Sequence, residues 1–280
     1  MSTPSDFVPF HALVTAPGAA PAAWMLVLHG ILGSGANFRT FARRVVEARP
    51  AWGLILVDLR AHGQSQDPPP PHTLDAAAAD LDRLVAHLGL DVRGVMGHSF
   101  GGKVALAYVA LRARGGAPLE RAFVLDSDPG ARPDGPGDFT SRQVLELLEA
   151  LPQPLPTREA FFEYMASRGI TRRTTDWLAM NVRRAEDGFR LRLDLPAIRA
   201  LLEDYFTRDL WPAVVDPSGV GHIELILGGR SDSVPADSRQ RLEDLSARSP
   251  HLGLRVLPEA GHWVHVDDPD GLLAAVIERL

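Results

Sequence analysis

Ser99 has the sequence surroundings of a reactive nucleophile. It is the third residue of Gly97-His98-Ser99-Phe100-Gly101, which directly follows the apolar run Val92–Met96 and begins a helical pattern. A serine on a tight strand-to-helix turn is held in strained backbone geometry, and the residues two positions away must be very small to avoid collision. The two glycines meet this need. The motif therefore predicts a hydroxyl nucleophile, and the alternative is a glycine-rich turn with a capping serine.

A serine hydroxyl becomes nucleophilic only when a base removes its proton. In enzymes with a serine on this kind of turn, the base is a histidine late in the chain. His262 follows the last apolar run, Leu254–Pro258, and is the candidate base. His265 is the rival, for which we expect a structural hydrogen bond. His29 and His98 adjoin the site and are expected to orient loops.

Two aspartates compete for the role of the acid that supports the histidine. Asp126 ends the apolar run Ala122–Asp126, whereas Asp232 follows the run Ile223–Gly228, where enzymes of this type most often carry the acid. Either carboxylate could reach the far imidazole nitrogen and stabilise the imidazolium. The residues by themselves leave both aspartates open.

An oxyanion at the reacting carbonyl needs two backbone N–H donors. The amide of Phe100 is the first candidate, because it directly follows the nucleophile. The second candidate is the amide of Ile31, in the loop after the run Trp24–His29, where Gly30 allows the backbone to turn toward the site.

Short runs rich in Val, Ile and Leu alternate with helical patterns through most of the chain. Such runs are typical of parallel strands buried on both faces, and the alternation predicts an α/β fold with a mostly parallel, doubly wound sheet. The expected strands are Trp24–His29, Gly53–Asp58, Val92–Gly97, Ala122–Asp126, Ile223–Gly228 and Leu254–Pro258, with an edge strand over Phe7–Val14. The expected helices are Leu74–Leu88 between a Thr73 cap and Gly89, Phe100–Arg114, Ala236–Arg248 and Pro269–Leu280.

The alternation stops between about Pro129 and Gly221, where no buried strand pattern occurs. We expect a core of residues 1–130 and 221–280 and a helical lid of residues 131–220, which begins with turns over Pro133–Gly137. Such an insertion emerges over the carboxyl ends of the strands, where ligands bind. Its expected helices are Ser141–Leu151, Thr157–Gly169, Thr175–Ala185 and Leu195–Asp209. Six of its side chains could line an acyl pocket, although most are expected to pack the lid onto the core: Phe161, Phe162, Tyr164, Met165, Trp177 and Met180.

Composition argues against several classes of function. The chain has 280 residues, 45% hydrophobic, and a net charge of −6 without a basic run, so we expect a globular protein with no nucleic-acid partner. It has no cysteine, and its histidines lack the spacing of a metal site, so we expect no metal and no cofactor. No apolar segment is long enough to span a bilayer, and no basic residue precedes Arg39, so we expect a cytoplasmic protein without a membrane partner.

Four ordered blocks make the chain similar to the α/β-hydrolase superfamily, and within it to the small bacterial short-chain esterases and mitochondrial abhydrolase-domain proteins. The blocks are His29–Ser34 with Asn37-Phe38, Asp58–Ser65, Gly97–Lys103 and Ala260–His265, and Asn181–Leu195 is similar to the family's lid segment. The resemblance covers nearly the whole chain. It implies an α/β-hydrolase fold and a serine hydrolase that cleaves a small-molecule carboxylic ester through Ser99, His262 and an aspartate.

The resemblance also bears on the acid. In this subgroup the catalytic aspartate lies after the strand that follows the nucleophile helix, which falls on Asp126, and a serine corresponding to Ser231 helps to hold the histidine. The chain departs from the pattern by also having Asp232, so Asp126 is favoured and Asp232 remains the alternative. Other reactions on the same scaffold are hydrolysis of thioesters, lactones or carbon–carbon bonds and cofactor-free perhydrolysis. A non-catalytic ligand receptor is the alternative of a different class.

Overall fold

The computed structural model describes residues 6–115, 117–132 and 141–280. In these ranges seven strands form one sheet in the order β1-β3-β2-β4-β5-β8-β9, in which only β1 runs antiparallel to its neighbour. The strands are β1 (His11–Val14), β2 (Ala23–Leu28), β3 (Trp52–Val57), β4 (Val92–His98), β5 (Leu119–Leu125), β8 (Val220–Gly228) and β9 (Leu252–Leu257). The mostly parallel sheet predicted from the sequence is confirmed. The turns expected over Pro133–Gly137 lie outside the described residues.

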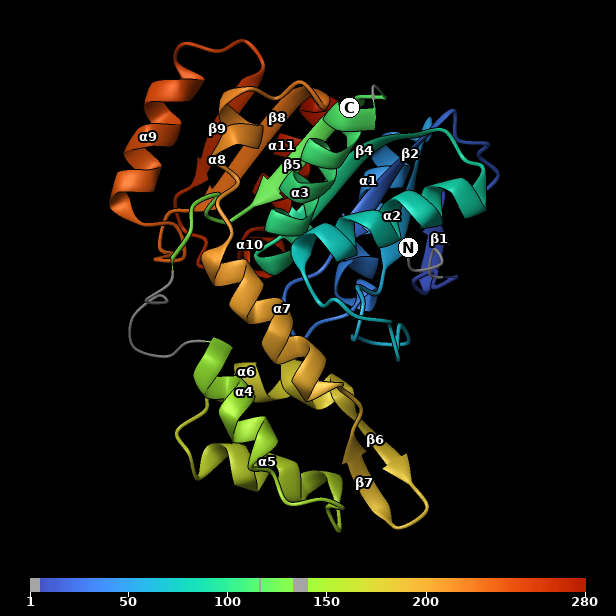
Figure 1. Cartoon of the computed structure of the whole chain (residues 1–280), viewed down its shortest axis with the longest axis vertical. Helices are drawn as coiled ribbons and strands as arrows, with labels where there is room; N and C mark the ends of the chain where they lie inside the picture. The colour runs from blue at the N-terminus through green and yellow to red at the C-terminus, as the bar shows by residue number, and fades with distance from the viewer. Residues whose placement is uncertain (1–5, 116, 133–140) are drawn as a thin grey trace.

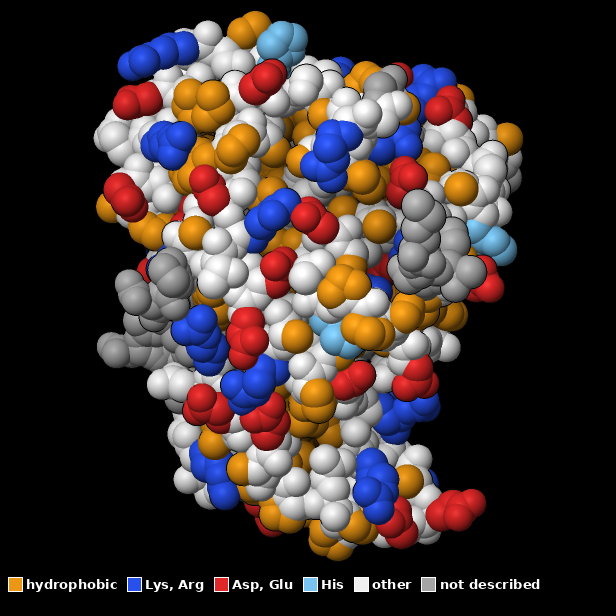
Figure 2. Space-filling model, in the orientation of Figure 1, with side chains coloured by type: hydrophobic (Ala, Val, Ile, Leu, Met, Phe, Trp, Pro, Cys, Tyr) orange, Lys and Arg blue, Asp and Glu red, His pale blue; other side chains and the backbone are white. Residues whose placement is uncertain are grey.

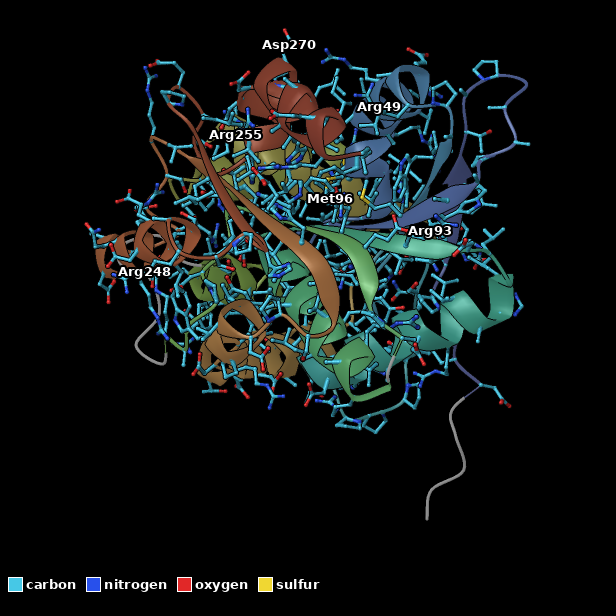
Figure 3. The ribbon with its side chains drawn as sticks, turned by 90° about the horizontal axis from the view of Figure 1, so that it is seen from above. Arg49, Arg93, Met96, Arg248, Arg255 and Asp270 are labelled. Carbon is cyan, nitrogen blue, oxygen red and sulfur yellow. The ribbon has the colours of Figure 1, made fainter. Side chains whose placement is uncertain are left out.

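Helices cover both faces of this sheet, which explains why its inner strands are apolar throughout. Every residue of β2 and β3 is buried. α1 (Arg39–Ala48) and α11 (Pro269–Arg279) pack on one face, and α2 (Leu74–Leu88), α3 (Phe100–Gly115) and α9 (Ala236–Ser246) pack on the other (Figure 3). Within β4, Val95 packs into the hydrophobic cluster on the side of α2 and α3, and Met96 into the cluster on the side of α1 and α11, because successive side chains of a strand point to opposite faces.

The ends of α2 follow from local sequence. The hydroxyl of Thr73 accepts a hydrogen bond of 3.1 Å from the amide of Ala76, so it caps the first turn. Gly89 ends the helix with φ +60°, a left-handed conformation that glycine adopts without a steric penalty. Both predicted boundaries are confirmed.

The segment between β5 and β8 carries a second layer, which we call the insert and define as α4 to α7. Its elements are α4 (Ser141–Glu149), α5 (Arg158–Ala166), α6 (Arg172–Leu178), the 3₁₀ turn η2 (Ala179–Asn181), β6 (Val182–Ala185), β7 (Gly188–Leu191) and α7 (Leu195–Thr207). Figure 1 shows these elements gathered at one end of the molecule, with α7 running back to the core. The short helix α8 (Trp211–Val215) then packs beside α3.

The helix predicted over Thr175–Ala185 is wrong. The chain forms α6 and η2 and then an antiparallel hairpin in which Val182 pairs with Leu191 and Ala185 with Gly188. Gly188 has φ +141°, so the turn depends on a backbone conformation that side chains rarely adopt. The Asp187-Gly188 pair, flanked by strand-like residues, was the sequence signal for this hairpin.

Two smaller differences concern the first part of the chain. β1 begins at His11 rather than Phe7, since Pro9 has no N–H to donate to a neighbouring strand. Three elements were not predicted from the sequence: α1, the 3₁₀ turn η1 (Gly35–Phe38) before it, and the short α10 (Val264–Asp267). In α1 the buried residues Phe41, Ala42, Val45 and Val46 have helical spacing, which was the available signal.

Lys103 joins the insert to the core. It is the only lysine in the sequence, and its side chain is buried. Its ammonium donates to the carbonyl oxygens of Gly130, Tyr205 and Arg208 at 2.6, 2.7 and 3.1 Å. Three N–H donors thus meet three acceptors, two at the end of α7 and one in the segment after β5, a geometry that a planar guanidinium does not reproduce.

The surface shown in Figure 2 carries basic and acidic side chains interspersed, without a field of one sign. None of the described helices combines the length and apolar composition needed to cross a membrane.

Candidate active site

Ser99 is the single residue between the end of β4 and the start of α3. Its φ is +53°, in the left-handed region that an L-residue adopts only under strain. A Cβ on Gly97 would lie 2.0 Å from the carbonyl oxygen of Gly101, and a Cβ on Gly101 would lie 2.5 Å from that of His29. Close backbone contacts therefore require both glycines of the motif, and the turn presents the serine side chain above the sheet edge.

A chain of hydrogen bonds connects three residues that are far apart in sequence. Ser99 Oγ lies 3.0 Å from Nε2 of His262, and Nδ1 of His262 lies 2.7 Å from Oδ2 of Asp126. His262 comes from the loop between β9 and α10, and Asp126 from the residue that follows β5. The parallel order of β4, β5, β8 and β9 brings these loops to one edge of the sheet. A hydroxyl, an imidazole and a carboxylate in this order can move a proton away from the serine.

The carboxylate of Asp126 is fully buried and oriented by its partners. Oδ1 accepts a 2.9 Å hydrogen bond from the amide of Gly228, and Oδ2 accepts from the hydroxyl of Ser231 as well as from His262. The backbone at Asp126 has φ +46°, which turns its side chain out of the strand direction. These contacts hold one carboxylate oxygen toward the imidazole.

Ser231 and Ser233 lie on either side of this carboxylate and imidazole. Ser231 was expected to hold the histidine, but its hydroxyl donates to Asp126 and so affects His262 only through that carboxylate. Ser233 Oγ lies 2.8 Å from Nδ1 of His262. Sequence reasoning missed Ser233, and its only signal was its position two residues after Ser231.

Asp232, the alternative acid, is placed differently. It lies between the two serines, and its side chain is exposed. Among the residues that the structure describes, no hydrogen bond or ion pair joins its carboxylate to His262. Because Ser231 and Ser233 both turn toward the site, the residue between them turns to solvent.

The two amides expected to hold an oxyanion flank Ser99. Phe100 is the first residue of α3, so its N–H has no earlier carbonyl of the same helix to bond. Ile31 lies in the turn after β2, and Gly30 and Ile31 line the same cavity as Ser99. Neither amide donates a hydrogen bond to another residue in the described ranges. A Cβ on Gly30 would lie 3.6 Å from Cβ of Ser99, so this loop passes close to Ser99.

Neutral histidines support the loops around the site. His98 donates from Nε2 to the carbonyl oxygen of His262 at 2.7 Å, and His29 donates from Nδ1 to Gly30 at 2.7 Å while Nε2 accepts from the amide of Leu59 at 3.0 Å. Burial lowers the pKa of His29 to about 4 and holds the pKa of His98 well below its ordinary value. Both rings are therefore uncharged at neutral pH, and the expectation that they orient loops agrees with these contacts.

His265 packs against an aromatic ring. Its ring is stacked on Phe38 with centroids 4.4 Å apart, and its Nδ1 has no hydrogen-bond partner among the described residues. The structure therefore shows stacking where the sequence predicted a structural hydrogen bond. Burial lowers the pKa of His265 to about 4.

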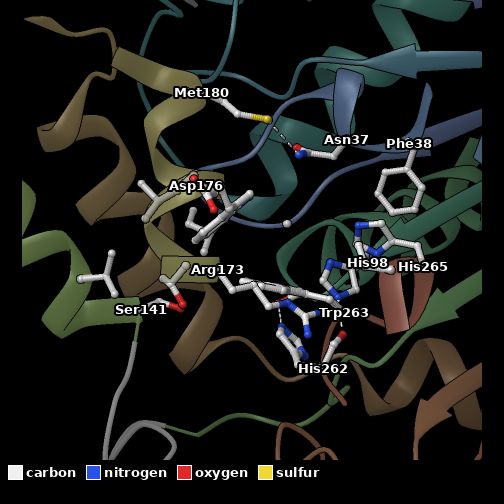
Figure 4. Close-up of a pocket in the computed structure, with 18 residues that line it drawn as sticks. Asn37, Phe38, His98, Ser141, Arg173, Asp176, Met180, His262, Trp263 and His265 are labelled. Carbon is white, nitrogen blue, oxygen red and sulfur yellow. Dashed lines mark hydrogen bonds between the residues drawn. The ribbon is translucent and has the colours of Figure 1, made fainter. Parts of the chain in front are cut away.

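A cavity of about 490 Å³ lies between Ser99 and the insert. Figure 4 shows His262 and Trp263 at one end and Met180 and Asn37 at another. Its apolar wall is formed by Ile31, Leu32, Phe38, Val144, Trp177, Met180, Trp263 and Val266. Of the six side chains proposed for an acyl pocket, Trp177 and Met180 line it, whereas Phe161 and Met165 are buried within the insert.

One charged side chain of the insert, that of Arg173, lines this cavity and contacts the core. The guanidinium of Arg173 lies 4.5 Å from the ring centroid of Trp263 and forms an ion pair with Asp267 in α10. The ring of Trp177 lies 5.8 Å from that of Trp263. α6 therefore contacts the loop that carries His262, and the cavity is bounded by both parts of the molecule.

The parallel sheet, the serine on a strained strand-to-helix turn and the histidine late in the chain define an α/β hydrolase. A model of the alpha/beta hydrolase family matches residues 25–276, and the chain belongs to this family. The sn-1-specific diacylglycerol lipase ABHD11 of Mus musculus is 29% identical over 270 residues, covering 94% of this chain and 82% of that protein. Esterase YbfF of Escherichia coli (strain K12) is 27% identical over 260 residues, covering 90% of this chain and 91% of that protein. A marine microorganism esterase shares the fold, with a TM-score of 0.78 at 23% identity over 98% of this chain and 100% of that chain.

Proposed function

We propose that this protein is a serine hydrolase that cleaves carboxylic esters of small molecules, with Ser99 as the nucleophile, His262 as the base and Asp126 as the acid. The observation that carries the proposal is the continuous hydrogen-bonded chain from Ser99 Oγ through His262 to the buried carboxylate of Asp126. Relatives of similar length that include an esterase and a lipase support the reaction class.

The reaction proceeds in two halves. Ser99 Oγ attacks the ester carbonyl while Nε2 of His262 takes the hydroxyl proton, and the amides of Ile31 and Phe100 donate to the oxyanion. The carbon–oxygen bond to the alcohol then breaks, and the alcohol leaves with the proton from His262. Water attacks the acyl-enzyme after giving a proton to the same nitrogen, and the carboxylic acid is released as Ser99 recovers its proton.

Asp126 stabilises the imidazolium that forms in each half-reaction. It has no counter-ion other than His262 within hydrogen-bond distance in the described ranges, and Gly228 and Ser231 fix its orientation. The exposed carboxylate of Asp232 lies in solvent, where its field is screened. We therefore assign the acid to Asp126 rather than to Asp232.

Residues 131–220 form the lid over the site in this proposal, and residues 1–130 and 221–280 form the catalytic core. Support comes from Trp177, Met180 and Arg173 of the insert, which line the cavity opposite Ser99. The apolar wall favours an uncharged organic group next to the reacting carbonyl. Exchange of the lid side chains would then change which ester is accepted and leave the chemical step in place.

The test is activity and labelling of Ser99→Ala. We expect hydrolysis of aryl esters to fall by at least about 1,000-fold, because no other residue can form the acyl-enzyme, while the unfolding midpoint stays near that of the wild type. A fluorophosphonate probe should label the wild type once and the variant not at all. Full esterase activity in Ser99→Ala, or an unlabelled and inactive wild type, contradicts the proposal, and the second result indicates a ligand receptor. Rates measured with a panel of matched thioesters and lactones then show whether the protein prefers one of the other reactions of this scaffold to ester hydrolysis.

A further inference from the structure

A second hollow, of about 260 Å³, lies on the other side of the cavity wall. It is formed by the start of α1 and its preceding turn on the core side and by the hairpin side of the insert. Three arginines line it: Arg39, Arg183 and Arg192. We refer to it as the arginine hollow.

The register of the hairpin explains why two of these arginines face the hollow. Val182 pairs with Leu191 and Arg183 with Arg190, and the amide of Arg192 donates to the carbonyl of Asn181 at 2.9 Å. Asn181, Arg183 and Arg192 therefore share one face of the hairpin. Asn181 is 7% exposed, and its amide group donates to the carbonyl of Leu32 at 2.8 Å. The Asn181 end of this face therefore packs against the core, whereas Arg183 and Arg192 beside it are exposed to solvent in the hollow.

The positive charge in the arginine hollow is not neutralised by ion pairs. In the described ranges, none of its three arginines forms a salt bridge, whereas the neighbouring Arg190 is paired with Asp187. Asp58 also lines the hollow, where its oxygens accept from the amides of Gly35 and Gln64 at 2.7 and 2.8 Å, so one carboxylate faces three guanidinium groups and the lining keeps an excess of positive charge. Like charges placed close together on a hairpin cost stability, so a local anion would be favourable here.

Met180 connects the two spaces, because its side chain lines both the cavity above Ser99 and the arginine hollow. Its sulfur contacts the side-chain amide of Asn37 at 3.8 Å, drawn as a dashed line in Figure 4. A methionine side chain has three rotatable bonds, and a sulfur acceptor forms only a weak hydrogen bond. Met180 therefore forms an adaptable part of the boundary between the two spaces.

We propose that the arginine hollow binds an anionic group, a carboxylate or a phosphate, at the far end of the ester substrate. Guanidinium groups bind both anions with paired N–H donors. The apolar cavity would hold the organic chain and Ser99 the ester. This inference rests on the proposed esterase function and adds a substrate class, namely esters that carry a negative charge remote from the reacting carbonyl.

The test compares p-nitrophenyl monoesters of straight-chain dicarboxylic acids with p-nitrophenyl esters of monocarboxylic acids of the same length, over a series of lengths and corrected for uncatalysed hydrolysis. At one or more lengths the wild type should give a higher kcat/KM for the charged ester. The double variant Arg183→Gln/Arg192→Gln should lower the ratio of charged to neutral kcat/KM by about 10-fold. Esters of phosphonoalkanoic acids form a parallel series for the phosphate form.

Arg184→Gln is the matched control, because Arg184 is exposed on the same strand but its side chain points to the opposite face. Its ratio should equal that of the wild type. An equal ratio in the double variant, or a preference lost only in Arg173→Gln, overturns the inference while leaving the esterase function intact. Failure of the wild type to hydrolyse either ester contradicts the proposed function itself.

Inorganic phosphate added to the same assays separates a bound substrate group from a free anion. If the inference holds, phosphate competes with the charged ester and affects the neutral ester less. Phosphate could instead affect the neutral ester only when Arg183 and Arg192 are present, while the wild type shows no preference for charged esters. This result would mean that the hollow binds a free anion, and it overturns the substrate assignment.

Discussion

The edge of the sheet and the insert face each other across the same cavity but are built differently. At the sheet edge, Asp126, His29 and His98 are buried, and hydrogen bonds to backbone atoms fix them. In the insert, the side chains that reach the cavity are held by stacking and by exposed ion pairs, as Arg173 is. This difference suggests that the sheet edge determines the chemical step and that the insert determines which ester is accepted.

The largest expected effect comes from replacing each of the two candidate acids in turn. Asp126→Asn should lower kcat/KM for an aryl ester by about 10,000-fold, because an amide stabilises the wrong imidazole tautomer and no imidazolium. Asp232→Asn should change it by less than about twofold, since an exposed carboxylate contributes little. Steady-state kinetics of the two variants decides the assignment. A large loss in Asp232→Asn alone would transfer the role of the acid to that residue.

The next largest effect is expected on stability, from the contact that Lys103 makes between the core and the insert. Lys103→Met removes three charge-assisted hydrogen bonds and leaves buried carbonyls unpaired, so we expect the free energy of unfolding to fall by about 3 kcal/mol. Lys103→Arg should not restore it, because the guanidinium fork does not match the three acceptors. Urea denaturation measures both variants.

Arg199→Met is the matched control inside the insert. Arg199 is partly exposed and pairs with Glu149, and such pairs contribute less than about 1 kcal/mol. Equal losses in the free energy of unfolding for Lys103→Met and Arg199→Met would show that the buried hydrogen bonds of Lys103 stabilise the protein no more than an exposed ion pair does.

Acid should weaken the sheet edge through histidines whose pKa is lowered in the folded protein. Burial holds the pKa of His265 at about 4, below its ordinary value of 6.5, so the unfolded chain binds a proton that the folded chain does not. This contribution to stability is present above pH 6.5 and is lost as the pH falls toward 4. For His265 alone the loss between neutral pH and pH 5 is on the order of 1 to 2 kcal/mol.

His265→Phe should reduce this acid sensitivity, because phenylalanine can keep the stacking on Phe38 and has no proton to bind. Urea midpoints at two pH values compare it with the wild type and with a substitution of His87, an exposed residue of α2. If the acid-induced loss of stability is the same in all three proteins, His265 makes no such contribution.

Small losses of activity are expected from changes to the serines beside Asp126 and His262. Ser231→Ala removes a donor to Asp126, and Ser233→Ala removes a contact with Nδ1 of His262. Each single hydrogen bond is worth about 1 kcal/mol, so kcat/KM should fall by about 5-fold in each variant. An effect on KM without one on kcat would indicate that these serines act on substrate binding instead.

Much of the sheet edge was predictable because its requirements are local. Two-sided burial demands apolar runs, which marked the inner strands, and the turn at Ser99 demands glycine at fixed positions. The insert was less predictable. The sequence of its hairpin predicts a helix, since short strands of mixed polarity around Glu186 and Asp187 give neither a clear period of 2 nor one of 3.6.

By itself, the sequence determined the parallel sheet, the turn at Ser99 and a histidine late in the chain, because these depend on residue type at short spacing. Only the tertiary structure showed that Asp126 contacts His262 while Asp232 is exposed, revealed Ser233 beside His262, and brought Arg39 into the same hollow as Arg183 and Arg192. The partners in these contacts are separated by long stretches of chain, 136 residues for Asp126 and His262. Their proximity is set by strand order and by which face of a loop or hairpin turns inward, and no local pattern encodes either.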